Sequence, residues 1–126
     1  AGYLINGHGH FTDLFGGFTD FPRLSFGGGL EIPLGCHFRL AAEQGTQMGL
    51  PELDIGTVPA WGGTARLTRC VGRAHALDMI LRARKISGPR ALEIGLVHEV
   101  WPNDVLQQKA LDLAHELSKM PPWSVE

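Results

Sequence analysis

The pattern of apolar and polar residues divides the chain into an irregular first part and a regular second part. Residues 1–26 are rich in Gly, Phe, His and Asp and show little periodicity, which is typical of loops and strand ends. Within them, the run Tyr-Leu-Ile at 3–5 predicts a short strand that ends at the turn signal Asn-Gly. From residue 27 onward the apolar positions recur regularly. We therefore separate an irregular Gly/Phe-rich front segment, 1–26, from an organised segment, 27–126.

The organised segment alternates predicted strands and helices. Alternating residues predict a strand over 37–41, and an apolar run predicts another over 96–101. Between them, the pattern predicts a helix over 66–83 that is interrupted at Gly72. This alternation of strands and helices favours the α/β class.

Signals for helix ends are found in three places. Residues 32–36 could continue a helix that starts at the glycines before them, and Pro33 is compatible with that helix only if it lies in the first turn. Ser87, followed by a proline, predicts an N-cap, and Gly95 predicts the end of that short helix. A long helix is predicted over 102–120, with Asn103 or Asp104 as its cap. Its apolar residues share one face: Leu106, Ala110, Leu113, Leu117 and Met120.

Composition narrows the functional classes. The length of 126 residues fits one domain, and 44% hydrophobic residues is ordinary for a globular protein. A net charge of −2 provides no strong field for nucleic acid or an anionic membrane, and no apolar run approaches the length of a bilayer-spanning helix. Cys36 and Cys70 are far apart in sequence, which predicts two buried thiols in a reducing compartment and hence a cytoplasmic protein.

Chemistry is first suggested by the stretch GGGLE at 27–31. A helix that opens on glycines presents unpaired N–H groups, and a substrate oxygen can approach them closely. Such a helix start could hold a carbonyl oxygen as it becomes anionic, with Glu31 in the first turn nearby. The same residues also fit a flexible loop, with Glu31 favoured by the helix dipole alone.

A longer set of motifs favours the catalytic interpretation of this stretch over the flexible loop. The stretches GGGLE at 27–31, GLPELDIGTVPAWGGTARLTRCVGRAHALDMIL at 49–81 and ISGPRALEIGLVHEVWP at 86–102 follow one another in order. This ordered set resembles the crotonase, or enoyl-CoA hydratase/isomerase, superfamily, and the resemblance covers 27–126. It implies an α/β fold, a partial crotonase-like β-β-α spiral with C-terminal helices.

The resemblance also implies a reaction and its residues. Gly28, next to Gly27, matches an oxyanion-hole N–H donor, while Glu31 and Glu52 match two glutamates that hold one water molecule. A 2-enoyl-CoA thioester is hydrated when one carboxyl group takes a proton from water and the other delivers one to carbon. No cofactor is implied beyond the coenzyme A of the substrate. The implied assembly is a homo-oligomer, a trimer or hexamer, with no nucleic-acid or membrane partner.

Two departures from the family pattern stand out. Ala60 and Trp61 precede GGT where the family usually has small residues, so Trp61 is either a packed loop aromatic or part of a changed acyl pocket. The front segment is also longer than expected between the Asn-Gly turn and the glycines. Either it is an insertion, or it belongs to the earlier family segment that carries the first oxyanion donor.

Two further groups of residues are weaker candidates. His8, His10, Asp13 and Asp20 have metal-ligand types, but Gly-rich loops often carry such residues and the family chemistry needs no metal, so we predict no metal site. Residues 62–90 hold seven basic residues against the single acid Asp78. They form either a phosphate- or RNA-contacting surface or, as we favour, a solvated helical face.

Overall fold

The front segment contains a small antiparallel sheet. The computed structural model of the chain describes residues 3–5, 10–13, 18–20, 24–26 and 28–121. The strands β1 (Tyr3–Ile5), β2 (His10–Asp13) and β3 (Phe18–Asp20) pair in that order. The predicted strand at 3–5 is therefore confirmed, whereas the Asn-Gly turn after it lies outside the described residues. The other two strands were not expected, because strands this short leave almost no periodicity in a sequence.

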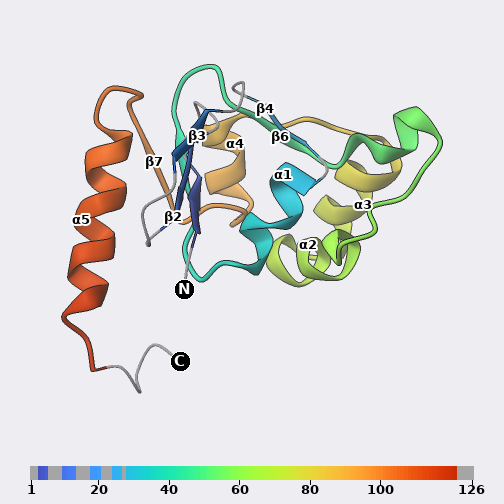
Figure 1. Cartoon of the computed structure of the whole chain (residues 1–126). Coiled ribbons are helices and arrows are strands. Elements are labelled where there is room, and N and C mark those ends of the chain that lie inside the picture. Colours follow the sequence, from blue (N-terminus) through green and yellow to red (C-terminus); the bar gives the residue numbers. More distant parts are fainter. Residues whose placement is uncertain (1–2, 6–9, 14–17, 21–23, 27, 122–126) are drawn as a thin grey trace.

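Two parallel strand pairs establish the α/β class (Figure 1). Strand β4 (Leu24–Phe26) pairs with β6 (Gln47–Gly49), and β5 (Leu40–Ala42) pairs with β7 (Glu99–Trp101). Parallel neighbours require crossover connections, and here these connections carry the helices. The predicted fold class is confirmed.

The glycine-rich stretch forms a shorter helix than predicted. Helix α1 covers only Gly28–Glu31, and a separate 3₁₀ turn, η1, covers Pro33–Gly35. Pro33 occupies the first position of η1, where its missing N–H is not needed. The expectation of one helix continuing to Cys36 is wrong, because the proline starts a new turn.

The central helices match their sequence signals. Helices α2 (Gly63–Val71) and α3 (Arg73–Leu81) are separated at Gly72, whose φ is 81°. Helix α4 (Gly88–Glu93) is capped by Ser87, whose hydroxyl oxygen accepts a hydrogen bond from the Arg90 N–H at 3.3 Å. After α4, Gly95 adopts a φ of 78°, a left-handed conformation that ends the helix.

Both predicted strands of the organised segment begin later than expected. Strand β5 starts at Leu40 rather than at residue 37. Strand β7 starts at Glu99 rather than at residue 96, because the N–H groups of Leu96 and Val97 donate to the Ala91 carbonyl and close the end of α4. An apolar run alone does not distinguish these buried turn residues from strand residues.

The last helix, α5 (Leu106–Ser118), is confirmed, but its predicted cap is wrong. Val105 precedes the helix and no side chain caps it. The Asn103 amide instead accepts from the Gln44 N–H at 3.1 Å and donates to the Gln44 carbonyl at 3.0 Å. Asn103 therefore connects the start of α5 to the turn between β5 and β6.

Two separate apolar clusters hold these elements. The larger joins α1, β6 and helices α2 to α4, with Leu30, Met48, Leu50 and Leu67 at its centre. The smaller lies between β5 and α5: Leu40, Ala42, Leu106 and Ala110. In Figure 1, α5 accordingly stands on the opposite side of the strands from α2 and α3.

Among the described residues, none of the helices is both long and apolar enough to cross a bilayer.

Candidate active site

Glu31 is a buried carboxylate held by the backbone of a distant segment. It is the last residue of α1, and only 4% of its surface is exposed. Its Oε1 accepts hydrogen bonds from the N–H groups of Trp61 and Gly63, each at 2.9 Å. Gly63 is the first residue of α2, so the carboxylate also compensates the unpaired N–H groups and partial positive charge at that helix start.

Gly63 permits this close approach because it has no side chain. A Cβ at this position would lie 2.6 Å from Oε1 of Glu31 and 2.7 Å from its Cγ. The preceding Gly62 has a φ of 85°, a conformation that residues with side chains rarely adopt. The two glycines of the GGT motif thus turn the chain and admit the carboxylate.

One oxygen of Glu31 is left for chemistry. Both hydrogen bonds of its carboxylate go to Oε1, and Oε2 has none within the part of the chain that the structure describes. Carboxylates that accept backbone N–H bonds are held in a fixed orientation, as a general acid or base requires. The geometry is therefore suited to positioning a single proton-transferring oxygen.

Glu52 lies on a different element and has an unusual feature of its own. It is the second residue of the 3₁₀ turn η2 (Pro51–Ile55), which packs against α3. Its backbone carbonyl accepts from the Thr57 N–H at 3.0 Å. Its side-chain Oε2 is buried, and no hydrogen-bond partner for it is found among the residues that the structure describes. A buried polar atom without a partner is costly, and such atoms are found where a substrate, water or proton completes the site.

The structure brings only some of the predicted site residues together. Glu31 is joined to Trp61 and Gly63 by hydrogen bonds, while Glu52 is placed independently on η2. Gly28 begins α1, as the oxyanion role requires, and Gly27 lies outside the described residues. The meeting of Glu31 and Glu52 over one water molecule, and the oxyanion role of Gly28, stay predictions.

Trp61 contributes its backbone rather than its ring. Trp61 is 66% exposed as a residue, while its N–H donates to Glu31 and its carbonyl accepts from Nη1 of Arg66 at 2.6 Å. The prediction that the ring shapes an acyl pocket remains open. Sequence reasoning missed Gly63 and Arg66, although the paired glycines before a helix were the available signal for Gly63.

The cysteines form no metal centre within the described part of the chain. Cys36 is buried, as predicted, and Cys70 is only half-buried. A search of the described residues finds no group of three or more His, Cys, Asp or Glu placed to hold a metal ion. His8 and the side chains of His10, Asp13 and Asp20, which make up the weaker metal candidate, lie outside what the structure describes, so that candidate is not tested.

Comparison with known proteins places these features in a family. The family described as Enoyl-CoA hydratase/isomerase matches residues 24–126. The chain belongs to the enoyl-CoA hydratase/isomerase family. The resemblance seen in the motifs is thereby confirmed, and the match begins at β4, three residues before the glycines.

Relatives of known structure show the same fold. The enoyl-CoA hydratase from Bacillus anthracis is 39% identical, with a TM-score of 0.77 over 81% of this chain and 39% of its own. An enoyl-CoA hydratase from Geobacillus kaustophilus HTA426 is 38% identical, with a TM-score of 0.72 over 75% of this chain and 36% of its own.

Among curated proteins, the chain is similar to part of a much larger one. It is 47% identical over 89 residues to the fatty acid oxidation complex subunit alpha of Shewanella baltica (strain OS185). That alignment covers 70% of this chain and 13% of the relative. The chain therefore spans about two fifths of the solved hydratases above and a small fraction of the oxidation-complex subunit.

Proposed function

We propose that this family member adds water to a 2-enoyl-CoA thioester, with Glu31 and Glu52 as the acid/base pair. The observation that carries the proposal is that each glutamate retains one carboxylate oxygen without a hydrogen-bond partner among the described residues. Hydration needs two such oxygens, since one proton must leave water and another must reach carbon. The similarity to enoyl-CoA hydratases supports the same chemistry.

The reaction follows from these groups. One carboxylate takes a proton from water while the water oxygen attacks C3 of the enoyl group, and the other carboxyl group gives a proton to C2. The thioester oxygen gains negative charge during the attack, and the N–H of Gly28 at the start of α1 would stabilise it. The two carboxyl groups take opposite roles, because one accepts a proton and the other gives one.

The test follows the loss of enoyl absorbance from crotonyl-CoA. We expect Glu31→Gln and Glu52→Gln each to lower kcat by about 10²- to 10⁴-fold, the usual range for a general acid or base. The glutamine amide oxygen at position 31 can still accept from Trp61 and Gly63, so thermal unfolding should change little. Glu43→Gln is the matched control, because Glu43 is exposed and its side chain is outside the site.

Other outcomes would reassign the chain. Loss of activity in Glu52→Gln alone would indicate isomerisation, which needs only one acid, and hydrolysis or decarboxylation of another acyl-CoA would appear as a different product. No binding of any acyl-CoA would instead indicate a non-catalytic member of the fold.

Homo-oligomeric assembly as a trimer or hexamer, and a cytoplasmic location, are part of the same proposal. Light scattering of the purified protein checks the assembly.

A further inference from the structure

Arg66 lies beside the turn that holds the Glu31 carboxylate, and it binds that turn at two consecutive carbonyls. Its side-chain Nη1 donates a hydrogen bond to the Trp61 carbonyl at 2.6 Å. Its backbone N–H donates to the Gly62 carbonyl at 2.9 Å, which is the first hydrogen bond of α2. The second bond would form with any residue in a helix, whereas the first requires the side chain of an arginine.

The same turn presents its N–H groups to Glu31. The N–H groups of Trp61 and Gly63 both donate to Oε1 of Glu31, each at 2.9 Å. Trp61 is thus bound on both sides of its Cα, through its N–H to Glu31 and through its carbonyl to Arg66. Because peptide groups are rigid planes joined at the Cα atoms, fixing a carbonyl also restricts the directions of the neighbouring N–H groups.

The turn needs an outside restraint because its centre is a glycine. Gly62, between Trp61 and Gly63, has a φ of 85°, and glycine reaches more backbone conformations than any other residue. Without a partner, the Trp61 carbonyl could therefore take other orientations. A hydrogen bond from a charged guanidinium group is stronger than one between neutral groups. Arg66 supplies the restraint that the glycines do not provide.

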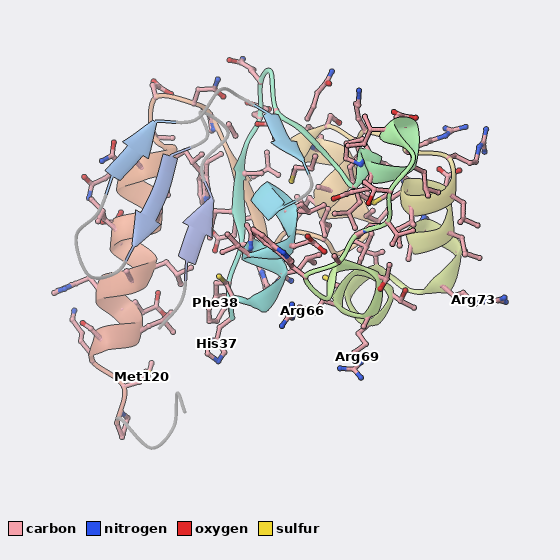
Figure 2. The ribbon with its side chains drawn as sticks, turned by 45° about the vertical axis from the view of Figure 1, so that its right-hand side comes forward. His37, Phe38, Arg66, Arg69, Arg73 and Met120 are labelled. Carbon is pink, nitrogen blue, oxygen red and sulfur yellow. The ribbon has the colours of Figure 1, made fainter. Side chains whose placement is uncertain are left out.

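The surroundings of Arg66 are shaped to the guanidinium group. A Cβ on Gly62 would lie 2.6 Å from Nη1 of Arg66, and a Cβ on Gly35, at the end of η1, would lie 4.0 Å from its Nε. In Figure 2, Arg66 accordingly lies between the cyan ribbon of η1 and the green helix α2, whereas Arg69 extends away from α2. The guanidinium group therefore rests against the turn instead of projecting into solvent.

Helix stability does not explain this arginine. Arg66 is the fourth residue of α2, close to the helix start, where the helix dipole disfavours a cation. An ion pair does not explain it either, since Arg66 has none within the described part of the chain. Its bond to the Trp61 carbonyl is the interaction that accounts for its placement.

We propose that Arg66 is a positioning residue for proton transfer at Glu31. The proposal rests on the proposed function, because it gives Arg66 a part in the reaction of that site. Arg66 fixes the turn, the turn fixes Oε1 of Glu31, and the other oxygen of the carboxylate thereby keeps one direction. A displaced proton-transferring oxygen slows the chemical step but leaves ground-state binding of the acyl-CoA unchanged. Loss of Arg66 should therefore lower kcat and not raise KM.

Two substitutions separate the hydrogen-bond donor from the bulk of the side chain. Arg66→Met keeps an apolar stem and removes every donor, while Arg66→Lys keeps a shorter cationic donor. With crotonyl-CoA, we expect Arg66→Met to lower kcat about 5- to 20-fold with KM within about twofold of wild type. Arg66→Lys should recover about half of the wild-type kcat, since a single donor to the Trp61 carbonyl is enough. A role in folding alone would leave kcat per folded molecule unchanged.

Arg69→Met is the matched control, because Arg69 is exposed on the same helix and has no side-chain hydrogen bond recorded among the described residues. Its kcat should equal that of the wild type. An unchanged kcat in Arg66→Met, an equal loss in Arg69→Met, a loss expressed in KM alone, or no recovery in Arg66→Lys would each overturn the positioning role.

The amide proton resonances of Trp61 and Gly63 provide a measurement that does not depend on catalysis. A hydrogen bond to a carboxylate shifts an amide proton downfield, so we expect both resonances to move upfield in Arg66→Met and to stay in place in Arg69→Met. Unmoved resonances in Arg66→Met would overturn the positioning role even if kcat fell. Wild-type protein without hydratase activity, but with the expected shifts, would overturn the proposed function, while the hold of Arg66 on the Glu31 carboxylate would stand.

Discussion

At the scale of single residues, the candidate site depends on a fit between one carboxylate and one glycine. Glu31 is buried, and within the described residues its carboxyl group accepts hydrogen bonds from two backbone N–H groups of the segment that starts α2. Without Gly63 the carboxylate could not reach those groups. Residues 31 and 63 therefore act as one unit although 32 positions separate them.

This fit predicts the effect of adding one methyl group. In Gly63→Ala, Cβ would overlap the Glu31 carboxyl group, so we expect a loss of about 1–3 kcal/mol in the free energy of unfolding. Inside an ordinary helix the same change would stabilise. Gly35→Ala is the control, because a Cβ there would meet only Nε of Arg66, at 4.0 Å. Denaturant unfolding measures both, and equal stabilities would contradict the fit.

A second residue-scale feature is the buried Arg39 and its neighbour His98. Arg39 is 8% exposed and donates to the carbonyls of Leu96 and Cys36 and to Sγ of Cys70. Its backbone N–H donates to Nδ1 of His98. Burial, and then the charge of Arg39, lower the pKa of His98 below 6.5, outweighing opposing effects of the Arg39 backbone and Glu99.

The lowered pKa of His98 predicts a pH dependence of stability. Between the folded pKa and 6.5, the unfolded chain binds more protons, so the free energy of unfolding rises with pH in that window. The contribution is complete above 6.5 and is lost as the pH falls through the folded pKa. Urea unfolding between about pH 5 and 7.5 should show this slope in wild type and in His75→Gln, but not in His98→Gln. An unchanged slope in His98→Gln would contradict the prediction.

At the scale of elements, the helix ends show which structural features a local sequence signal can predict. Ser87 caps α4 as its sequence predicts, because an N-cap is a contact between residues three apart. Asn103 has the same kind of signal before α5, but its amide is used by Gln44, 59 residues away. A local pattern could not reveal that competing partner.

Replacing Asn103 distinguishes the two roles. An N-cap tolerates aspartate as well as asparagine, whereas the contact with Gln44 needs the amide as a donor. In Asn103→Asp the new carboxylate would face the Gln44 carbonyl, so we expect a loss of about 1 kcal/mol in the free energy of unfolding. Asp104→Asn, at the exposed neighbouring position, should change it by less than about 0.5 kcal/mol. Thermal or denaturant unfolding measures both variants. An unchanged free energy of unfolding in Asn103→Asp would indicate that Asn103 acts as an N-cap after all.

At the scale of the whole molecule, α5 is held by its own apolar cluster. Leu106 and Ala110 pack on Leu40 and Ala42 of β5, apart from the larger cluster around α2 and α3. The ammonium group of Lys109 adds a cation–π contact with the ring of Trp101, 4.4 Å from its centre. The predicted apolar face of α5 is buried at its first two members, while Met120 at its end is 47% exposed.

The separate cluster predicts that α5 can be loosened selectively. Leu106→Ala removes a fully buried side chain, so we expect a loss of about 2–4 kcal/mol in the interactions that hold α5. Amide hydrogen exchange should accelerate in α5 and much less in α2 and α3. Leu111→Ala, where the side chain is 43% exposed, is the control and should change little. A uniform acceleration over all helices would show that the clusters unfold together.

The sequence by itself determined the family, the α/β class, the break at Gly72 and the cap at Ser87, because motifs and local contacts depend on residues close along the chain. It also identified Glu31 and Glu52 as candidates through the resemblance. Only the tertiary structure decided which groups form contacts. These are the Gly63 N–H with the Glu31 carboxyl group, the Asn103 amide with the Gln44 backbone, and the Arg39 guanidinium with buried carbonyls. These contacts join segments 32 to 59 residues apart in sequence. A local sequence pattern cannot predict them, because folding alone brings such distant segments together.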